Sequence, residues 1–197
     1  MRQAVRSGRR AVLAAVLVML ATSDRSQRIY ALGQADPGHS IEAEVKGTLK
    51  PGFQISATGL TWDVDISEDG TLRQAAEQLA GKQVIVRGKY AERNDGPRVR
   101  RILTARALEP AAETGRREYV DVTVRGTLRV GVVAIGGETT GATITAGPVT
   151  WELELDGGQR ELAVRLNGST ALVSGPIRPV GGVEVRTRTI LTVRRIQ

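Results

Sequence analysis

The sequence predicts an all-β protein built from two tandem copies of one small five-stranded barrel, with one short helix in each copy. Two observations carry this prediction: short motifs recur in the same order along the chain, and apolar residues alternate with polar ones. Aromatic residues make up only 3% of the 197 residues. A core in this chain is therefore built from Val, Ile, Leu and Ala, which together with Met and the few aromatics give 41% hydrophobic residues.

The repeat is the strongest pattern in the chain. Its three matches are Val45–Lys50 with Val124–Arg129, Thr61–Ile66 with Thr150–Leu155, and Ile102–Thr104 with Ile190–Thr192. The offsets are 79, 89 and 88 residues, so the order is kept and one insertion separates the first two matches. Ordered self-similarity of this kind indicates a duplicated structural unit.

Domain boundaries follow from the repeat and from the composition between its copies. The stretch around residues 109–117 is polar, contains Pro and Gly, and lacks an apolar period, which is typical of a linker. We therefore predict a signal peptide and disordered segment over residues 1–35, a first barrel over 40–109, a linker over 110–117 and a second barrel over 118–197.

The first copy opens with a strand whose residues from Ile41 to Leu49 alternate between apolar and polar. This period of two predicts one buried face, and Gly47 falls on it, where a barrel strand bends sharply. A second strand follows the turn at Pro51. A third strand carries Trp62 in phase with its apolar residues, so we predict that this indole packs in the core rather than stacking on a ligand.

A helix is predicted over residues 71–79, with Thr71 and Gln74 as a capping box and Gly81 as its end. Strands over residues 84–90 and 99–108 complete the copy. The second copy repeats this plan with Trp151 in its third strand and a shorter helix over 159–166. A longer first hairpin leaves a six-stranded or sandwich-like variant open for the second copy.

The order β-β-β-α-β-β, read twice, resembles the OB-fold, a five-stranded Greek-key barrel with a helix between its third and fourth strands. The resemblance covers nearly all of residues 40–197 and extends to small OB-like domains of exported bacterial proteins. It implies a fold and not an activity. In OB barrels, ligands bind on the outer face of strands two and three, beside the loops that join strands 1–2 and 4–5.

The N-terminus has the pattern of a secretory signal. Four arginines within residues 2–10 precede an uncharged apolar run over 11–21, and polar residues follow it. We therefore expect an exported, periplasmic or extracellular protein whose signal ends between residues 21 and 35, with either ordinary or twin-arginine export. The membrane is contacted only through this signal if it stays uncleaved.

The net charge of +7 is concentrated in this leader. Residues 1–35 hold six arginines and one aspartate, whereas residues 36–197 hold 22 basic and 20 acidic groups. The expected mature chain is nearly neutral, which argues against a nucleic-acid partner. A cluster of basic residues between Lys89 and Arg101 is interpreted as a solvated barrel rim, because Glu92 and Asp95 lie among them.

The predicted ligand face is polar and carries two carboxylates in each copy, Asp63 and Asp65 in the first and Glu152 and Glu154 in the second. These four residues are the candidate ligand-binding residues. No aromatic ring accompanies them, whereas single-stranded nucleic acid prefers stacking rings and positive charge.

No catalytic, cofactor or metal site is predicted. The chain has no Cys and one His, His39, and it lacks nucleophile-elbow and phosphate-loop motifs. The segment from Asp65 to Gly70 begins like a calcium loop, but its twelfth position is Ala76 rather than a carboxylate. We therefore expect no enzyme and no cofactor.

These observations lead us to expect an exported, non-catalytic binding or adaptor protein of the cell envelope. Its partner would be an envelope protein, a glycan or a small ligand. An alternative is a structural or stress-protective envelope protein that assembles through barrel edges. Single-stranded nucleic-acid binding and catalysis rank below both, and a nucleic-acid partner is not expected.

Overall fold

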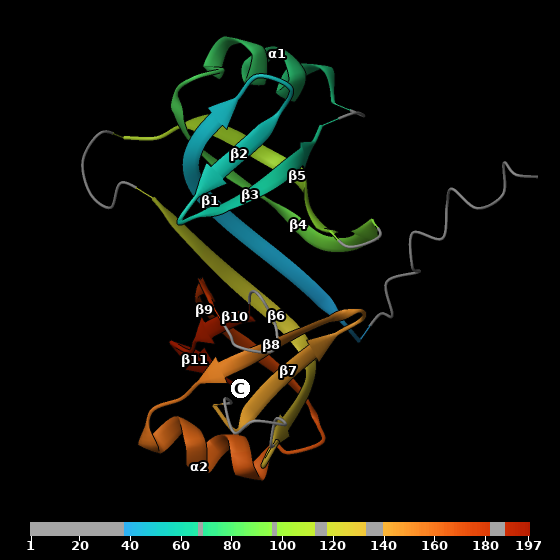
Figure 1. Cartoon of the computed structure of the whole chain (residues 1–197), viewed down its shortest axis with the longest axis vertical. Helices are drawn as coiled ribbons and strands as arrows, with labels where there is room; N and C mark the ends of the chain where they lie inside the picture. The colour runs from blue at the N-terminus through green and yellow to red at the C-terminus, as the bar shows by residue number, and fades with distance from the viewer. Residues whose placement is uncertain (1–37, 67–68, 96–97, 113–117, 133–139, 182–187) are drawn as a thin grey trace, which may run out of the picture. The chain divides into compact units, whose positions relative to one another are not determined.

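A computed structural model describes residues 38–66, 69–95, 98–112, 118–132, 140–181 and 188–197 (Figure 1). The predicted signal segment lies outside these residues, as does most of the predicted linker. The first half contains β1 (Ser40–Lys50), β2 (Gln54–Ala57), β3 (Leu60–Asp65), α1 (Gly70–Leu79), β4 (Gln83–Asp95) and β5 (Arg98–Pro110). The second half contains β6 (Tyr119–Val130), β7 (Ala142–Ala146), β8 (Val149–Glu154), α2 (Gly157–Arg165), β9 (Thr170–Val180), β10 (Arg188–Thr192) and β11 (Arg195–Ile196).

The first five strands close into a barrel. They pair in the order β1-β2-β3-β5-β4, and β4 returns to pair with β1. The pairing of β3 with β5 is parallel and the others are antiparallel. With α1 between β3 and β4, this is the OB-fold order. The predicted mostly-β protein with a five-stranded OB-type barrel and two short helices is confirmed.

The remaining strands pair in the order β6-β7-β8-β10-β9, with β9 also on β6 and β11 added to β9. Strand β1 is shared, because it pairs with β6 from Ser40 opposite Arg125 to Lys46 opposite Tyr119. Figure 1 shows these two long strands side by side. The described strands therefore form one 11-stranded sheet, and their buried side chains form one hydrophobic cluster. The predicted division into two tandem barrels with separate cores is not confirmed.

Buried apolar and more exposed polar residues alternate along the strands, as the sequence predicts. Along β1, Ile41, Ala43, Val45 and Leu49 are buried while the residues between them are mostly half-exposed. Gly47 interrupts the apolar series because β2 passes close by: a Cβ there would lie within 3.0 Å of the Ser56 carbonyl oxygen. The inward glycines thus mark close strand packing.

Acidic residues cap both helices. The Asp69 carboxylate accepts hydrogen bonds from the amides of Thr71 and Leu72, at 2.9 and 3.0 Å. The cap of α1 is therefore Asp69 and not the predicted Thr71. At α2, Asp156 and Gln159 form a reciprocal capping box, in which each side chain accepts from the other residue's amide. Such caps satisfy amides that have no partner within the helix.

Strands β4 and β5 are longer than predicted, with 13 residues each. Their pairing continues to Asp95 opposite Arg98, well beyond the part of β4 that pairs with β1. The result is a long hairpin between strands four and five of the barrel. In OB-folds the loop at this place borders the ligand.

Candidate functional site

The predicted acidic face of the first half is neutralised by an arginine from the neighbouring strand. Arg100 on β5 donates from Nε and Nη2 to Asp63 Oδ2, at 2.9 and 2.7 Å. Gln54 donates to the other oxygen of the same carboxylate at 2.8 Å. These hydrogen bonds, that of Arg100 first, hold the pKa of Asp63 below its ordinary value. Asp65 stays exposed at the end of β3.

The same arrangement recurs in the second half. Arg188 donates to Glu152 Oε1 at 3.1 Å, and Arg178 donates to Glu154 Oε1 at 3.3 Å. Arg100 and Arg188 each lie two residues before the repeated Ile-Leu-Thr motif, so they occupy the same place in the repeat. The structure brings each predicted carboxylate pair beside an arginine that sequence reasoning did not connect with it. The recurrence of an arginine two residues before each Ile-Leu-Thr motif was the sequence signal that could have predicted these ion pairs.

Replacing Asp63 by asparagine tests this neutralisation. Because the folded-state pKa of Asp63 is lowered, its charge stabilises the fold above the unfolded pKa, and this stabilisation is lost as pH falls through the folded pKa. We expect Asp63→Asn to be less stable than the parent at pH 7 and equal to it in strong acid. The effect is small because solvent screens the exposed Arg100 side chain. Urea unfolding as a function of pH measures it. A constant difference across all pH values would contradict the ion pair.

Positive charge is segregated onto the hairpins between strands four and five of each half. Residues 89–106 contain six basic and two acidic side chains, and the matching residues 176–194 contain four basic and one acidic. The rest of residues 36–197 holds 12 basic and 17 acidic side chains. The near-neutral total of residues 36–197 therefore hides two basic segments, and the remainder of those residues is acidic.

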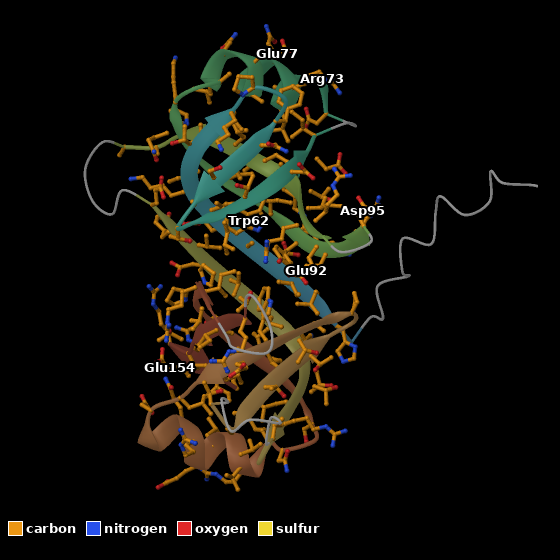
Figure 2. The ribbon with its side chains drawn as sticks, in the orientation of Figure 1. Trp62, Arg73, Glu77, Glu92, Asp95 and Glu154 are labelled. Carbon is orange, nitrogen blue, oxygen red and sulfur yellow. The ribbon has the colours of Figure 1, made fainter. Side chains whose placement is uncertain are left out.

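Two basic side chains of the first basic hairpin lie exposed to solvent. Lys89 and Arg93 are exposed on β4 and make no ion pair within the described residues. Figure 2 labels Glu92 and Asp95 on the same hairpin. Glu92 accepts a hydrogen bond from Tyr90 at 2.5 Å and lies 3.9 Å from Arg101. Burial of Tyr90 and the negative charge of Glu92 raise the pKa of this phenol, which stays a donor at neutral pH.

Both tryptophans belong to the core, as predicted. Trp62 is fully buried and Trp151 is 2% exposed, and Figure 2 labels Trp62 among the strands. Trp151 meets Tyr90 edge to face, with ring centroids 5.3 Å apart. Phe53 is half-buried with the Arg73 guanidinium 5.7 Å from its ring centroid. The described aromatic rings are therefore engaged within the protein.

The described residues give no metal cluster and no membrane helix. Within them, no three His, Asp or Glu side chains come together as metal ligands, and Asp69 of the calcium-like segment caps α1. No helix in the described part of the chain is both long and apolar enough to cross a bilayer.

Comparison with known proteins yields structural likeness alone. No protein-family model matches the chain, and no curated protein matches it either. Among solved structures, it is similar to the wild-type single-stranded DNA binding protein from Thermus aquaticus, at 14% identity and a TM-score of 0.46, with 80% of this chain and 91% of that chain covered. A deletion mutant of the same Thermus aquaticus protein matches at 17% identity and a TM-score of 0.46, with 81% and 94% covered.

Two expectations are corrected here. We expected an envelope adaptor or structural protein, and a partner other than nucleic acid; the two solved structures reported above as similar are instead those of a single-stranded DNA binding protein. The physical error lies in the charge argument. Averaging over residues 36–197 concealed the basic hairpins, and the face described as acidic carries the Arg100 and Arg188 guanidinium groups beside its carboxylates.

Proposed function

We propose that this chain consists of two OB-type barrels in tandem and binds single-stranded nucleic acid along the basic hairpins β4–β5 and β9–β10. The observation that carries the proposal is the segregation of charge: residues 89–106 and 176–194 are basic, whereas the rest of residues 36–197 is acidic. These segments lie where OB barrels border their ligands. The repeated pairing order of the two halves supports the tandem arrangement.

The chemistry of the hairpins defines the mode of binding. Guanidinium and ammonium groups contact phosphates whatever the base, and each contact releases counterions from the strand. Since the described aromatic rings are buried or half-buried, stacking adds little. We therefore expect binding that depends steeply on salt and weakly on base sequence.

The test is titration of the full chain with a fluorescent oligothymidylate of about 30 nucleotides, long enough for two OB sites. Anisotropy is measured over a range of salt concentrations. In the double variant Lys89→Gln/Arg93→Gln, we expect weaker binding and a salt slope shallower by about 1.4, because each phosphate contact on a single strand contributes about 0.7. Both side chains are exposed, so the fold is retained.

The matched control is Arg160→Gln/Arg165→Gln, which removes the same charge from the exposed face of α2. This variant is expected to bind like the parent. Equal losses in both double variants would mean that net charge alone attracts the strand, and absence of binding by the parent at low salt would remove the proposal.

We further propose that the protein is not an enzyme. General acid–base catalysis favours a carboxyl group whose pKa is raised toward neutrality. Here burial raises the pKa of Glu44, but hydrogen bonds from Tyr119 and Arg87 outweigh it and hold the pKa below its ordinary value. Asp63 is shifted in the same direction. The N-terminal export signal stays a prediction, which N-terminal sequencing of the mature protein tests.

A further inference from the structure

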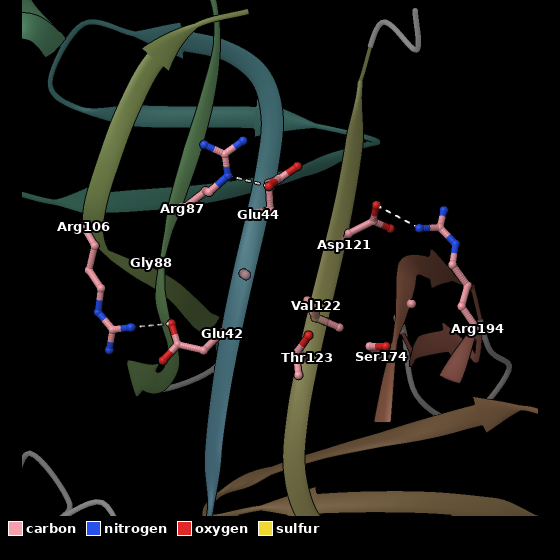
Figure 3. A pocket seen from close by; sticks show the side chains of 12 residues that line it. Glu42, Glu44, Arg87, Gly88, Arg106, Asp121, Val122, Thr123, Ser174 and Arg194 are labelled. Carbon is pink, nitrogen blue, oxygen red and sulfur yellow. Dashed lines mark hydrogen bonds and ion pairs between the residues drawn. The ribbon is translucent and has the colours of Figure 1, made fainter. Parts of the chain in front are cut away.

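A groove of about 490 Å³ crosses the outward face of β4, β1, β6 and β9 (Figure 3). Its floor is a row of four neighbouring backbone positions, one on each strand. In order across the sheet they are Gly88, Ala43, Val122 and Gly175, and each is paired with the next. Charged side chains form the walls. The groove is distinct from the basic hairpin tips.

The groove has an internal two-fold arrangement. Ala43 and Val122 are separated by the 79-residue offset of the repeat, so the antiparallel β1–β6 pairing is centred on two equivalent residues. Gly88 and Gly175 are equivalent in the same way, and all 12 lining residues fall into equivalent pairs. Each half of the groove can therefore be compared with the other.

One ion pair is the same in both halves. Arg106 donates to Glu42 at 3.1 Å in the first half, and Arg194 donates to Asp121 at 3.0 Å in the second. Figure 3 shows these two pairs on opposite sides of the groove. In each pair the guanidinium uses only Nη1 within the described residues, which leaves further N–H donors available.

One cross-strand ion pair of the first half is missing from the second. In the first half Arg87 lies opposite Glu44, and the two form an ion pair at 2.5 Å. In the second half the equivalent residues are Ser174 and Thr123, which lie opposite one another. Neither hydroxyl makes a side-chain hydrogen bond in the part of the chain that the structure describes. Two short side chains thus stand where the other half holds a guanidinium and a carboxylate.

The Asp121 carboxylate supplies a charged acceptor at the same place. Its side chain is 30% exposed and its Oδ2 accepts the hydrogen bond from Arg194, whereas Oδ1 is enclosed and out of reach of a ligand. The second half of the groove therefore combines a carboxylate oxygen, two hydroxyls and a guanidinium with unused donors.

We propose that the groove beside Thr123 and Ser174 binds a small molecule that carries both charged groups of the absent ion pair, a guanidinium and a carboxylate, namely an amino acid with a guanidinium side chain. Its guanidinium donates to Asp121 Oδ2, which it shares with Arg194, and to the Thr123 hydroxyl. Its carboxylate accepts from the unused N–H groups of Arg194 and from the Ser174 hydroxyl. Charge-assisted hydrogen bonds of this kind are stronger than neutral ones.

The experiment titrates L-arginine into the ¹⁵N-labelled full chain and follows the amide signals by NMR. We expect saturable shifts at Thr123 and Ser174. Agmatine, which lacks the carboxylate, and citrulline, which lacks the charge of the guanidinium, are expected to bind at least about tenfold more weakly, because each loses a charge-assisted contact.

The decisive variant rebuilds the ion pair of the first half in the second. Thr123→Glu/Ser174→Arg fills the site with its own side chains and is expected to abolish the arginine-dependent shifts, while its melting temperature stays at or above that of the parent. The reverse variant Glu44→Thr/Arg87→Ser opens an equivalent site and is expected to bind a second arginine.

Three results would overturn the proposal. These are an absence of shifts with L-arginine, shifts confined to residues outside the groove, and full binding by a folded Thr123→Glu/Ser174→Arg variant. None of these results bears on the oligonucleotide titration, since all four substituted residues lie outside the basic segments 89–106 and 176–194.

Discussion

Replacing Trp62 by alanine is expected to lower the free energy of unfolding by about 3–5 kcal/mol. The side chain is fully buried and is the largest of the completely enclosed ones. Its removal leaves a cavity that the closed barrel around it cannot fill, since β3 is paired on both sides, with β2 and with β5. Domains of this size have about 5–15 kcal/mol of stability in total, so the loss is a large fraction.

Urea unfolding followed by circular dichroism measures this loss. The indole Nε1 of Trp62 is buried without a hydrogen-bond partner in the described structure, so Trp62→Phe removes a costly donor together with part of the apolar surface. We expect Trp62→Phe to be clearly milder than Trp62→Ala. The control Val164→Ala changes a side chain that is 58% exposed on α2 and is expected to stay within about 0.5 kcal/mol of the parent. A Trp62→Ala variant as stable as this control would refute the buried position.

Replacing Gly88 by alanine is expected to cost about 3 kcal/mol or more, at the upper end of the range for overpacked cores. A Cβ at this position would lie within 3.0 Å of the backbone oxygen and carbon of Thr104. These are backbone atoms of β5, so no side chain can rotate to make room. The pairing of β4 with β5 already shifts register between Arg87 and Gly88, and the added methyl group would force the two strands apart.

Thermal unfolding of Gly88→Ala beside Gly157→Ala checks this expectation. Gly157 lies at the start of α2, and a Cβ there would meet nothing within 4 Å. Since alanine favours helices more than glycine does, Gly157→Ala is expected to be neutral or slightly stabilising. The equivalent Gly175→Ala is expected to behave like Gly88→Ala, because its Cβ would approach the Thr192 carbonyl oxygen in the same way. If Gly88→Ala unfolded at the temperature of the Gly157→Ala control, the close packing of β4 on β5 would be wrong.

Local patterns predicted the elements of the fold well. The alternation from Ile41 to Leu49 and the phase of Trp62 placed the buried faces correctly, because side-chain direction in a strand depends only on position. The position of Gly47 on an inward face was also foreseen, although its cause is the nearby Ser56 carbonyl rather than a bend alone. The OB order followed from counting these elements.

Contacts between distant residues were not foreseen, and they decide the character of the site. The Arg100–Asp63 ion pair depends on the parallel register that sets Asp63 opposite Ile102, and no local period encodes that register. The same holds for the β1–β6 pairing, which joins the halves into one sheet. Net charge summed over residues 36–197 was also a poor guide, since ligands respond to local potential.

The centring of the β1–β6 pairing on Ala43 and Val122 has a consequence for how the chain can vary. Two separate identical molecules joined in this way would come apart on dilution, and every substitution would appear on both sides at once. Here one polypeptide carries both strands. Each strand therefore meets the other at an effective concentration in the millimolar range, and the pairing does not depend on the concentration of the protein. Each half is free to change alone, which is how one half can keep the Arg87–Glu44 ion pair while the other carries Ser174 and Thr123 at the equivalent positions.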